Sequence, residues 1–157
     1  MAVKFEISDD FIRAMRRMSK TSEEFRGHVE KTLLKCGDAL NKCLLDEVEK
    51  NDVLSDDMKE RLAREIDNKI VHSSNFLVQS EAGWLFEKYV TVKPPTGVLA
   101  IWHNYGTKER QTAAGYNRGF VHPAKFVKRA RERAAKQIEN IQKDMMKEVE
   151  EKWLKID

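Results

Sequence analysis

The chain has 157 residues, enough for one domain with a substantial core, and its 41% hydrophobic and 35% charged residues are typical of a globular protein with a heavily charged surface. No run of about 18 apolar residues is present, so no membrane-spanning helix is indicated. The net charge of +3 conceals an uneven distribution, because residues 108–136 carry nine Lys or Arg against two Glu, a local balance of +7 that leaves −4 for the remainder.

Two helices are predicted at the start of the chain. Ser8-Asp9-Asp10 is typical of a helix N-terminus, where a side-chain oxygen caps the first N–H groups and acids favour the positive end of the dipole. A short amphipathic helix is therefore expected over about 8–19. Thr21 and Glu24 have the spacing of a capping box. Behind them apolar residues recur every three or four positions, which predicts a long helix over about 21–50 with one packing face.

Cys36 and Cys43 lie on that packing face. Seven residues of helix separate them by about 10 Å along the axis, which is too far for an unstrained disulfide. We therefore expect reduced thiols in the core of a protein made in the cytoplasm, with no metal or redox role.

The hydrophobic period changes twice in the second half of the chain. A cap signal at Ser55 and apolar residues spaced by four predict a helix over 55–69. Aromatic and β-branched residues follow, interrupted by the turn-forming segments Glu-Ala-Gly and Lys-Pro-Pro-Thr-Gly. They predict an antiparallel meander with strands over about 70–79, 84–93 and 98–105. From Pro123 the helical period returns and predicts a long helix over 123–153.

These elements predict a single α+β domain over 1–157, with a small antiparallel sheet of three to four strands flanked by long N-terminal and C-terminal helices. The core is expected to draw on both long helices and on the sheet. Its expected members are Phe25, Val29, Leu33, Leu40, Phe86, Val90, Ile101, Phe126, Ile138 and Ile141.

Motifs of catalysis and metal binding are absent from the sequence. The four histidines, His28, His72, His103 and His122, form no HExxH pair, and neither a CxxC nor a G-x-S-x-G motif occurs. We therefore expect no catalytic, cofactor-binding or metal-binding residues and no small-molecule substrate. A metal-dependent nuclease that uses His103 and His122 is a minor hypothesis, because the acidic pair of such sites is missing.

A second hypothesis is a small basic protein that binds nucleic acid. Trp102, Tyr105 and Tyr116 interleave with Lys108, Arg110 and Arg118, and aromatics beside cations can stack bases and contact phosphates. No zinc-finger, RRM or helix-turn-helix signature accompanies them. Trp102 and Tyr105 would also face opposite sides of the predicted strand, which argues against a flat stacking platform. A charge run of this kind is also typical of a solvated helix face beside a loop.

The order of elements and the region 98–130 resemble a known family. An Ala-x-Trp-x-Asn-x-Gly-Thr segment, a polar glycine-bearing loop, and then Phe-x-x-Pro-Ala before a terminal helix are similar to the tail-component proteins of long-tailed phages and prophages. These are also called tail-completion or head–tail neck proteins, or minor tail proteins. The matching residues are Ala100, Trp102, Asn104, Gly106, Thr107, Phe120, Pro123, Ala124, Phe126 and Ala130.

The resemblance implies structural work in a virion tail or neck, with several copies forming a ring, for example a hexamer, around the DNA channel. Expected partners are other copies, head-connector proteins, tail-tube or tail-terminator proteins and, transiently and without sequence preference, DNA. The loop over 106–122 would then order against a neighbouring subunit, whereas in a monomeric domain it would only be mobile. Its residues and anchors are expected to be Trp102, Asn104, Tyr105, Gly106, Thr107, Lys108, Arg110, Tyr116, Arg118, Phe120 and Pro123.

Overall fold

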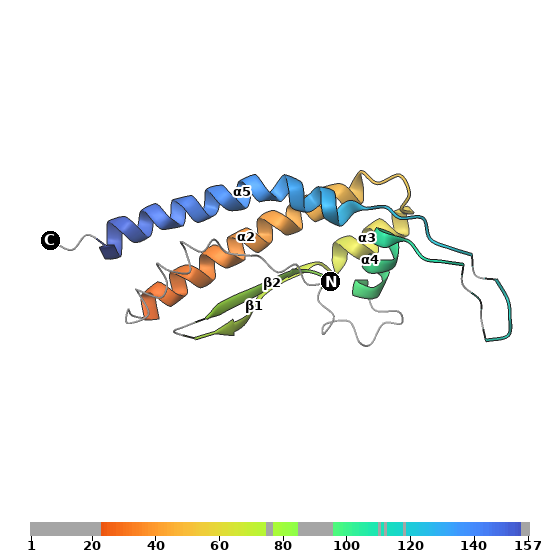
Figure 1. Ribbon diagram of the computed structural model, residues 1–157, viewed down its shortest axis with the longest axis horizontal. Helices are drawn as coiled ribbons and strands as arrows, with labels where there is room; N and C mark the ends of the chain where they lie inside the picture. Colours follow the sequence, from red (N-terminus) through yellow and green to blue (C-terminus); the bar gives the residue numbers. More distant parts are fainter. Residues whose placement is uncertain are drawn as a thin grey trace.

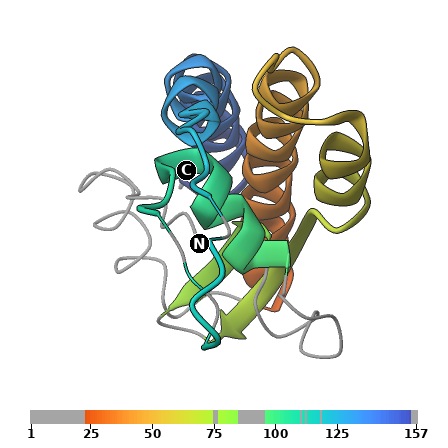
Figure 2. The ribbon, with the colours of Figure 1, turned by 90° about the vertical axis from the view of Figure 1, so that its right-hand side faces the viewer.

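The computed structural model describes residues 23–74, 77–84, 96–109, 111, 113–117 and 119–154. Its elements are α2 (Glu23–Glu49), α3 (Asp56–Arg64), β1 (Asp67–Ser73), β2 (Val78–Gly83), α4 (Thr96–Tyr105) and α5 (Phe126–Val149), and a π-helical turn over Glu150–Leu154 extends α5. The two long helices run antiparallel side by side, and the β1–β2 hairpin lies against α2 (Figures 1 and 2). The fold class is α+β, as predicted.

The two long helices follow the predicted pattern. α2 covers most of the segment expected to be helical over 21–50, and α5 with its π-helical turn covers most of 123–153. Because the helices are antiparallel, the beginning of each packs against the end of the other. Leu44 and Val48 thus share a core cluster with Phe126, whereas Phe25 and Val29 pack with the last turns of α5 in a second cluster.

Trp84 joins the hairpin to the larger of these clusters. Its ring meets that of Phe126 edge to face, with centroids 5.5 Å apart, and its indole N–H donates to the backbone oxygen of Leu62 over 2.8 Å. A buried indole needs such a partner, because an unpaired N–H in the core is costly. The contact fixes α3, the end of β2 and the start of α5 relative to one another.

Gly37 allows the hairpin to approach α2 closely. A Cβ atom at this position would overlap the amide of Asn68 at the start of β1. That amide donates to the backbone oxygen of Leu34 over 2.6 Å, and the Asn41 amide donates to the backbone oxygen of Asp67 over 2.8 Å. The glycine that interrupts the apolar pattern of the predicted helix therefore has a packing role.

The strand predicted over 98–105 is wrong, because this segment is the helix α4. Its most buried positions include Thr96, Ala100 and Asn104, which are spaced by four and lie on one helix face. A short apolar run such as Val98–Trp102 fits a buried strand or a buried helix equally well from sequence, since period alone cannot separate them.

The segment predicted as one strand over 70–79 is a hairpin. β1 and β2 pair antiparallel, and the Ser74 N–H donates to the backbone oxygen of Leu77 over 2.8 Å across the turn between them. The predicted Glu-Ala-Gly turn lies inside β2, and the helix predicted over 55–69 ends at Arg64. Neither glycine nor proline marks the true turn, which explains the error.

Several predictions fall partly or wholly outside the described residues. The helix over 8–19, the strand over 84–93 beyond Trp84, and the core residues Phe86 and Val90 lie outside the described residues. Within the described part the sheet has two strands instead of three to four. The other expected core residues are buried, except that Ile101, Ile138 and Ile141 are half-buried.

Candidate functional site

The described residues of 106–122, which we call the arm, project from the end of the molecule where α4 stops and α5 begins (Figure 1). Among the described residues of the arm no helix or strand occurs, although Gln111 and Asn117 form an isolated antiparallel bridge. The Asn117 amide donates to the Glu109 carboxylate over 2.7 Å, and its oxygen accepts from the Gly119 N–H over 2.7 Å. The arm is thus folded back on itself at its tip.

Large apolar side chains of the arm region face solvent. Tyr116 is 73% exposed and Phe120 is 56% exposed, and Tyr105, immediately before the arm, is 60% exposed. The Phe120 ring contacts His122 edge to face, with centroids 4.5 Å apart. Aromatic residues are enriched at protein interfaces, because they bury a large area at low entropic cost. The exposed side chains therefore give the arm the composition of a contact surface.

The arm is joined to the helices by two short segments, 104–107 at the end of α4 and 121–125 before α5, which together we call the root. The first segment depends on Gly106 and Thr107. Gly106 has φ of 77°, a conformation that other residues resist. A Cβ atom there would also lie 2.8 Å from the backbone oxygen of Val121. The Thr107 N–H donates to that same oxygen over 3.0 Å, and the Thr107 hydroxyl oxygen accepts from the Val121 N–H over 3.0 Å. These two bonds close the arm at its base.

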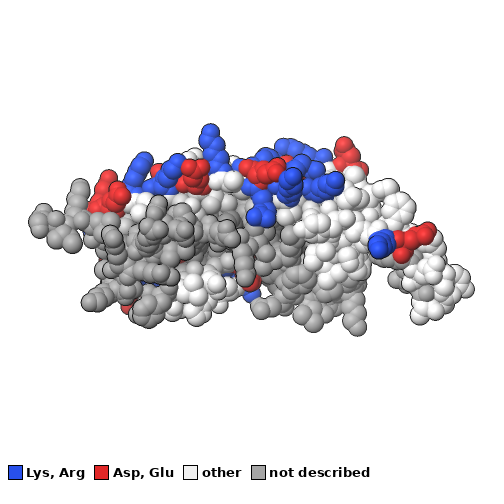
Figure 3. All heavy atoms as spheres, in the orientation of Figure 1, with Lys and Arg blue, Asp and Glu red and all other residues white. Residues whose placement is uncertain are grey.

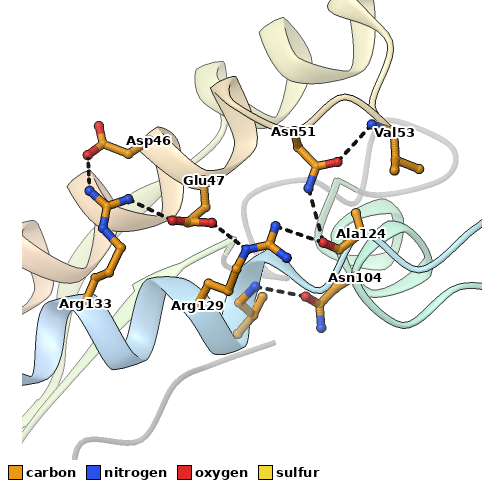
Figure 4. Close-up of polar contacts among 9 residues, drawn as sticks. Asp46, Glu47, Asn51, Val53, Asn104, Ala124, Arg129 and Arg133 are labelled. Carbon is orange, nitrogen blue, oxygen red and sulfur yellow. Dashed lines mark hydrogen bonds and ion pairs between the residues drawn. The ribbon is translucent and has the colours of Figure 1, made fainter.

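Asn104 joins the end of α4 to the start of α5. Its side chain is buried, and its Oδ1 accepts from the Val127 N–H over 2.9 Å, so it satisfies one of the open donors of the first turn of α5 (Figure 4). Its backbone oxygen accepts from the Lys125 N–H over 3.0 Å. Lys125 itself has a left-handed backbone with φ of 51°. Asn104 therefore replaces the local N-cap that the sequence around Lys125 does not provide.

The second segment of the root is held by α2 and the turn after it. The backbone oxygen of Ala124 accepts from the Asn51 amide over 3.1 Å and from the Arg129 guanidinium over 3.0 Å (Figure 4). The Asn51 oxygen in turn accepts from the Val53 N–H over 3.1 Å. The chain entering α5 is thus tied to the C-terminal end of α2.

Two arginines on α5 extend this tie along α2. The Arg129 Nε lies 2.7 Å from a Glu47 carboxylate oxygen, and Arg133 reaches both Glu47, at 2.8 Å, and Asp46, at 2.9 Å (Figure 4). Glu47 is largely covered, with 13% of its side chain exposed. The hydrogen bond from Arg129, with further help from Arg133, holds the pKa of the Glu47 carboxyl below its ordinary value. The carboxylate stays charged and the ion pairs persist at neutral pH.

The predicted site residues fall into four groups. Asn104, Gly106, Thr107 and Pro123 meet at the root, where the Pro123 ring would lie 3.0 Å from a Cβ atom on Gly106. Trp102 is half-buried on α4, and the exposed residues are Tyr105, Lys108, Tyr116 and Phe120. Arg110 and Arg118 lie outside the described residues.

Sequence reasoning missed the residues of α2 and α5 that brace the root, namely Glu47, Asn51, Arg129 and Arg133. Their contacts between the two halves of the chain span 73 to 87 positions in the sequence. The spacing of Arg129 and Arg133 by four was the one available signal, since it places both guanidinium groups on one helix face.

The described residues offer little for metal or thiol chemistry. No group of three or more His, Cys, Asp or Glu side chains that could hold a metal ion occurs among them. Cys36 and Cys43 are buried and carry no disulfide, and burial raises the pKa of the Cys36 thiol to about 11, so it stays protonated at neutral pH. In the same part of the chain, no helix has both the length and the apolarity of a membrane span.

Comparisons with protein families, curated proteins and solved structures find no match for this chain.

Proposed function

We propose that this chain is a structural tail-completion or head–tail neck protein of a long-tailed phage or prophage, and that it forms a ring around the DNA channel. Its partners are other copies of itself, a head-connector protein and a tail-tube or tail-terminator protein. It is made in the bacterial host cytoplasm and resides in the virion neck or tail. The proposal includes no catalytic residue, cofactor, metal, membrane or small-molecule substrate.

The observation that carries the proposal is the combination of a projecting arm with a braced root. Tyr116 and Phe120 expose aromatic surface that the subunit does not bury by itself. The root is nevertheless fixed by hydrogen bonds to Asn51, Asn104 and Arg129. An arm held at its base can present its contact residues to a neighbour in one orientation, which lowers the entropic cost of assembly.

The residues that resemble the tail-component family support the same proposal. The Trp102–Thr107 part of the motif ends a helix here, although a strand end was expected. Asn104 and Gly106 within it nevertheless form the root, and Pro123-Ala124 supplies the other side. The motif therefore coincides with the structural origin of the arm.

Mass photometry or analytical ultracentrifugation of the purified protein tests the assembly part of the proposal. We expect an oligomeric species, alone or in the presence of tails, that Tyr116→Ser combined with Phe120→Ser abolishes. Val53→Ser is the matched control, because Val53 is an apolar residue of similar exposure, 53%, outside the arm. An oligomer unaffected by the double change, or equally affected by the control, would show that the arm does not mediate assembly.

A second candidate function, direct nucleic-acid binding, is favoured by the exposure of Tyr116 and Lys108 on the same arm. It predicts tight binding to DNA or RNA through aromatic stacking that survives moderate salt. Fluorescence anisotropy with the isolated protein separates the two functions. Submicromolar affinity at physiological salt, lost on Trp102→Ala or Tyr116→Ala, would replace the neck proposal with this one.

A further inference from the structure

The first half of α5, counted with its N-cap residue Lys125, and the second half carry opposite charge. Residues 125–136 contain six cations and one acid, a balance of +5, whereas residues 137–149 contain two cations and three acids, a balance of −1. In the second half, Lys143 lies 2.5 Å from Glu139 and Lys147 lies 4.0 Å from Asp144. The cations of that half are therefore matched within one helical turn.

The first half holds too few acids to match its cations within the helix, with one Glu against six Lys or Arg. Arg129 and Arg133 are occupied by Glu47 and Asp46, which leaves four cations, Lys125, Lys128, Arg131 and Lys136, against Glu132. Lys128 lies 3.8 Å from Glu132, a pair comparable to Lys147–Asp144, yet 82% of its side chain is exposed, and residues 125–136 hold no further acid for the other three cations. Figure 3 shows Lys and Arg side chains along the edge of the molecule that α5 forms, with Asp and Glu side chains among them. We call Lys125, Lys128, Arg131 and Lys136 the basic face.

The start of the basic face opposes the local electrostatics of a helix. The N-terminal end of a helix carries partial positive charge, so the cations at its first turn, Lys125 and Lys128, are unfavourable there. α2 and α3 begin with acidic pairs, Glu23-Glu24 and Asp56-Asp57, whereas the first turn of α5 holds no acid and is preceded by Lys125. A charge pattern that costs stability in one helix, when two others follow the rule, indicates a role outside folding.

We propose that the basic face binds the phosphate backbone of duplex DNA. The inference rests on the proposed function, since it assigns one face of the subunit to the DNA inside the ring. From Lys128 to Lys136 the helix rises about 12 Å, and Lys128, Arg131 and Lys136 lie within a sector of about 140°. Cations so arranged along a rod can follow successive phosphates, which carry no sequence information. Contacts to the backbone alone let DNA and protein slide past each other.

The test compares two variants of the full-length protein in anisotropy titrations with a labelled duplex of about 30 base pairs, at about 50 mM and about 200 mM salt. Lys128→Gln, Arg131→Gln and Lys136→Gln together should lower the affinity at least about tenfold at the lower salt. The slope of log affinity against log salt should become shallower by about 3 × 0.9, or 2.7, because three fewer counterions are released. The matched control, Lys143→Gln with Lys147→Gln on the same helix, should change the affinity less than about twofold.

The outcomes separate this inference from the proposed function. Equal loss in the control variant, or an unchanged salt slope in the triple variant with a wild-type circular dichroism spectrum and Tm, overturns the basic face as a DNA site. Loss of the oligomer with retained DNA binding also overturns it and assigns the face to an acidic protein partner. DNA binding that depends on the basic face, in a protein that neither oligomerises nor joins heads to tails, supports the face and contradicts the neck function.

Discussion

Phe126, at the start of α5, is fully buried, whereas Phe120, six residues earlier in the arm, keeps 56% of its surface exposed. The two side chains are identical, so the difference comes from their surroundings. Phe126 meets Trp84 and the end of α2 inside the larger core cluster, and Phe120 contacts the ring of His122 at the surface of the arm. The helical body, which comprises the helices α2 to α5 and the β1–β2 hairpin, buries its apolar residues for its own stability, whereas the arm leaves Tyr116 and Phe120 exposed.

The largest expected effect is on the stability of the helical body. Phe126→Ala should lower the free energy of unfolding by about 3–5 kcal/mol, because it leaves a cavity between α2, α5 and Trp84. Tyr116→Ala, an aromatic truncation in the arm, should change it by less than about 0.5 kcal/mol. Urea denaturation of both variants measures the contrast. Comparable losses from the two would show that the arm packs on the body.

Gly106→Ala should have the next largest effect. The substitution forces a side chain into a positive φ, at about 1–2 kcal/mol, and drives its Cβ against Val121 and Pro123, for about 1 kcal/mol more. Gly115→Ala is the matched control, because Gly115 has φ of 81° but a Cβ atom there would meet nothing within 4 Å. Thermal unfolding of the pair should show a clearly lower Tm for the Gly106 variant; equal Tm values would mean that the root is not tight.

Asn104→Ala should destabilise the protein by about 1–3 kcal/mol, because it leaves the buried Val127 N–H without its acceptor. Asn117→Ala removes two hydrogen bonds of an exposed asparagine in the arm and should cost less than about 0.5 kcal/mol. Chemical denaturation of both variants measures the two losses in the free energy of unfolding. Amide exchange at Val127 that stays as slow in the Asn104 variant as in the wild type would contradict this role.

The smallest effect concerns pH. The pKa of Glu47 is lowered in the folded state from its ordinary 4.5, so its stabilising contribution is present above that value and is lost as the pH falls through the folded-state pKa. Glu47→Gln should therefore reduce the difference in urea midpoint between about pH 7 and about pH 3.5. Glu139→Gln, in an exposed pair with Lys143, should reduce it less. A larger reduction from Glu139→Gln than from Glu47→Gln would show that the Arg129–Glu47 pair does not stabilise the packing of α5 on α2.

The sequence predicted the body better than the root for a physical reason. α2 and α5 are long, and their apolar residues repeat with the helical period over many turns, so local pattern and tertiary packing agree. α4 was mistaken for a strand because its apolar run is short and follows two prolines. The hairpin was mistaken for one strand over 70–79, because the Ser74–Leu77 turn carries no glycine or proline that would mark it in the sequence.

The candidate site likewise has residues that the sequence predicts and residues that it does not. Gly106 and Thr107 could be found because glycine and threonine at a chain reversal have known local geometry, and the structure gives Gly106 a positive φ. The contacts of Ala124 with Asn51, and of Arg129 with Glu47, join residues more than 70 positions apart. No local pattern encodes such contacts, since they arise only when the two long helices pack.

Electron microscopy of heads and tails, mixed in the presence of the purified protein, tests most directly whether the arm serves assembly. The wild-type protein should join connector-bearing heads to tails lacking this component. Tyr116→Ser with Phe120→Ser should leave the Tm unchanged and abolish the joining, and Val53→Ser should behave as the wild type. Full joining by the double variant, or no joining by the wild-type protein, would contradict the account.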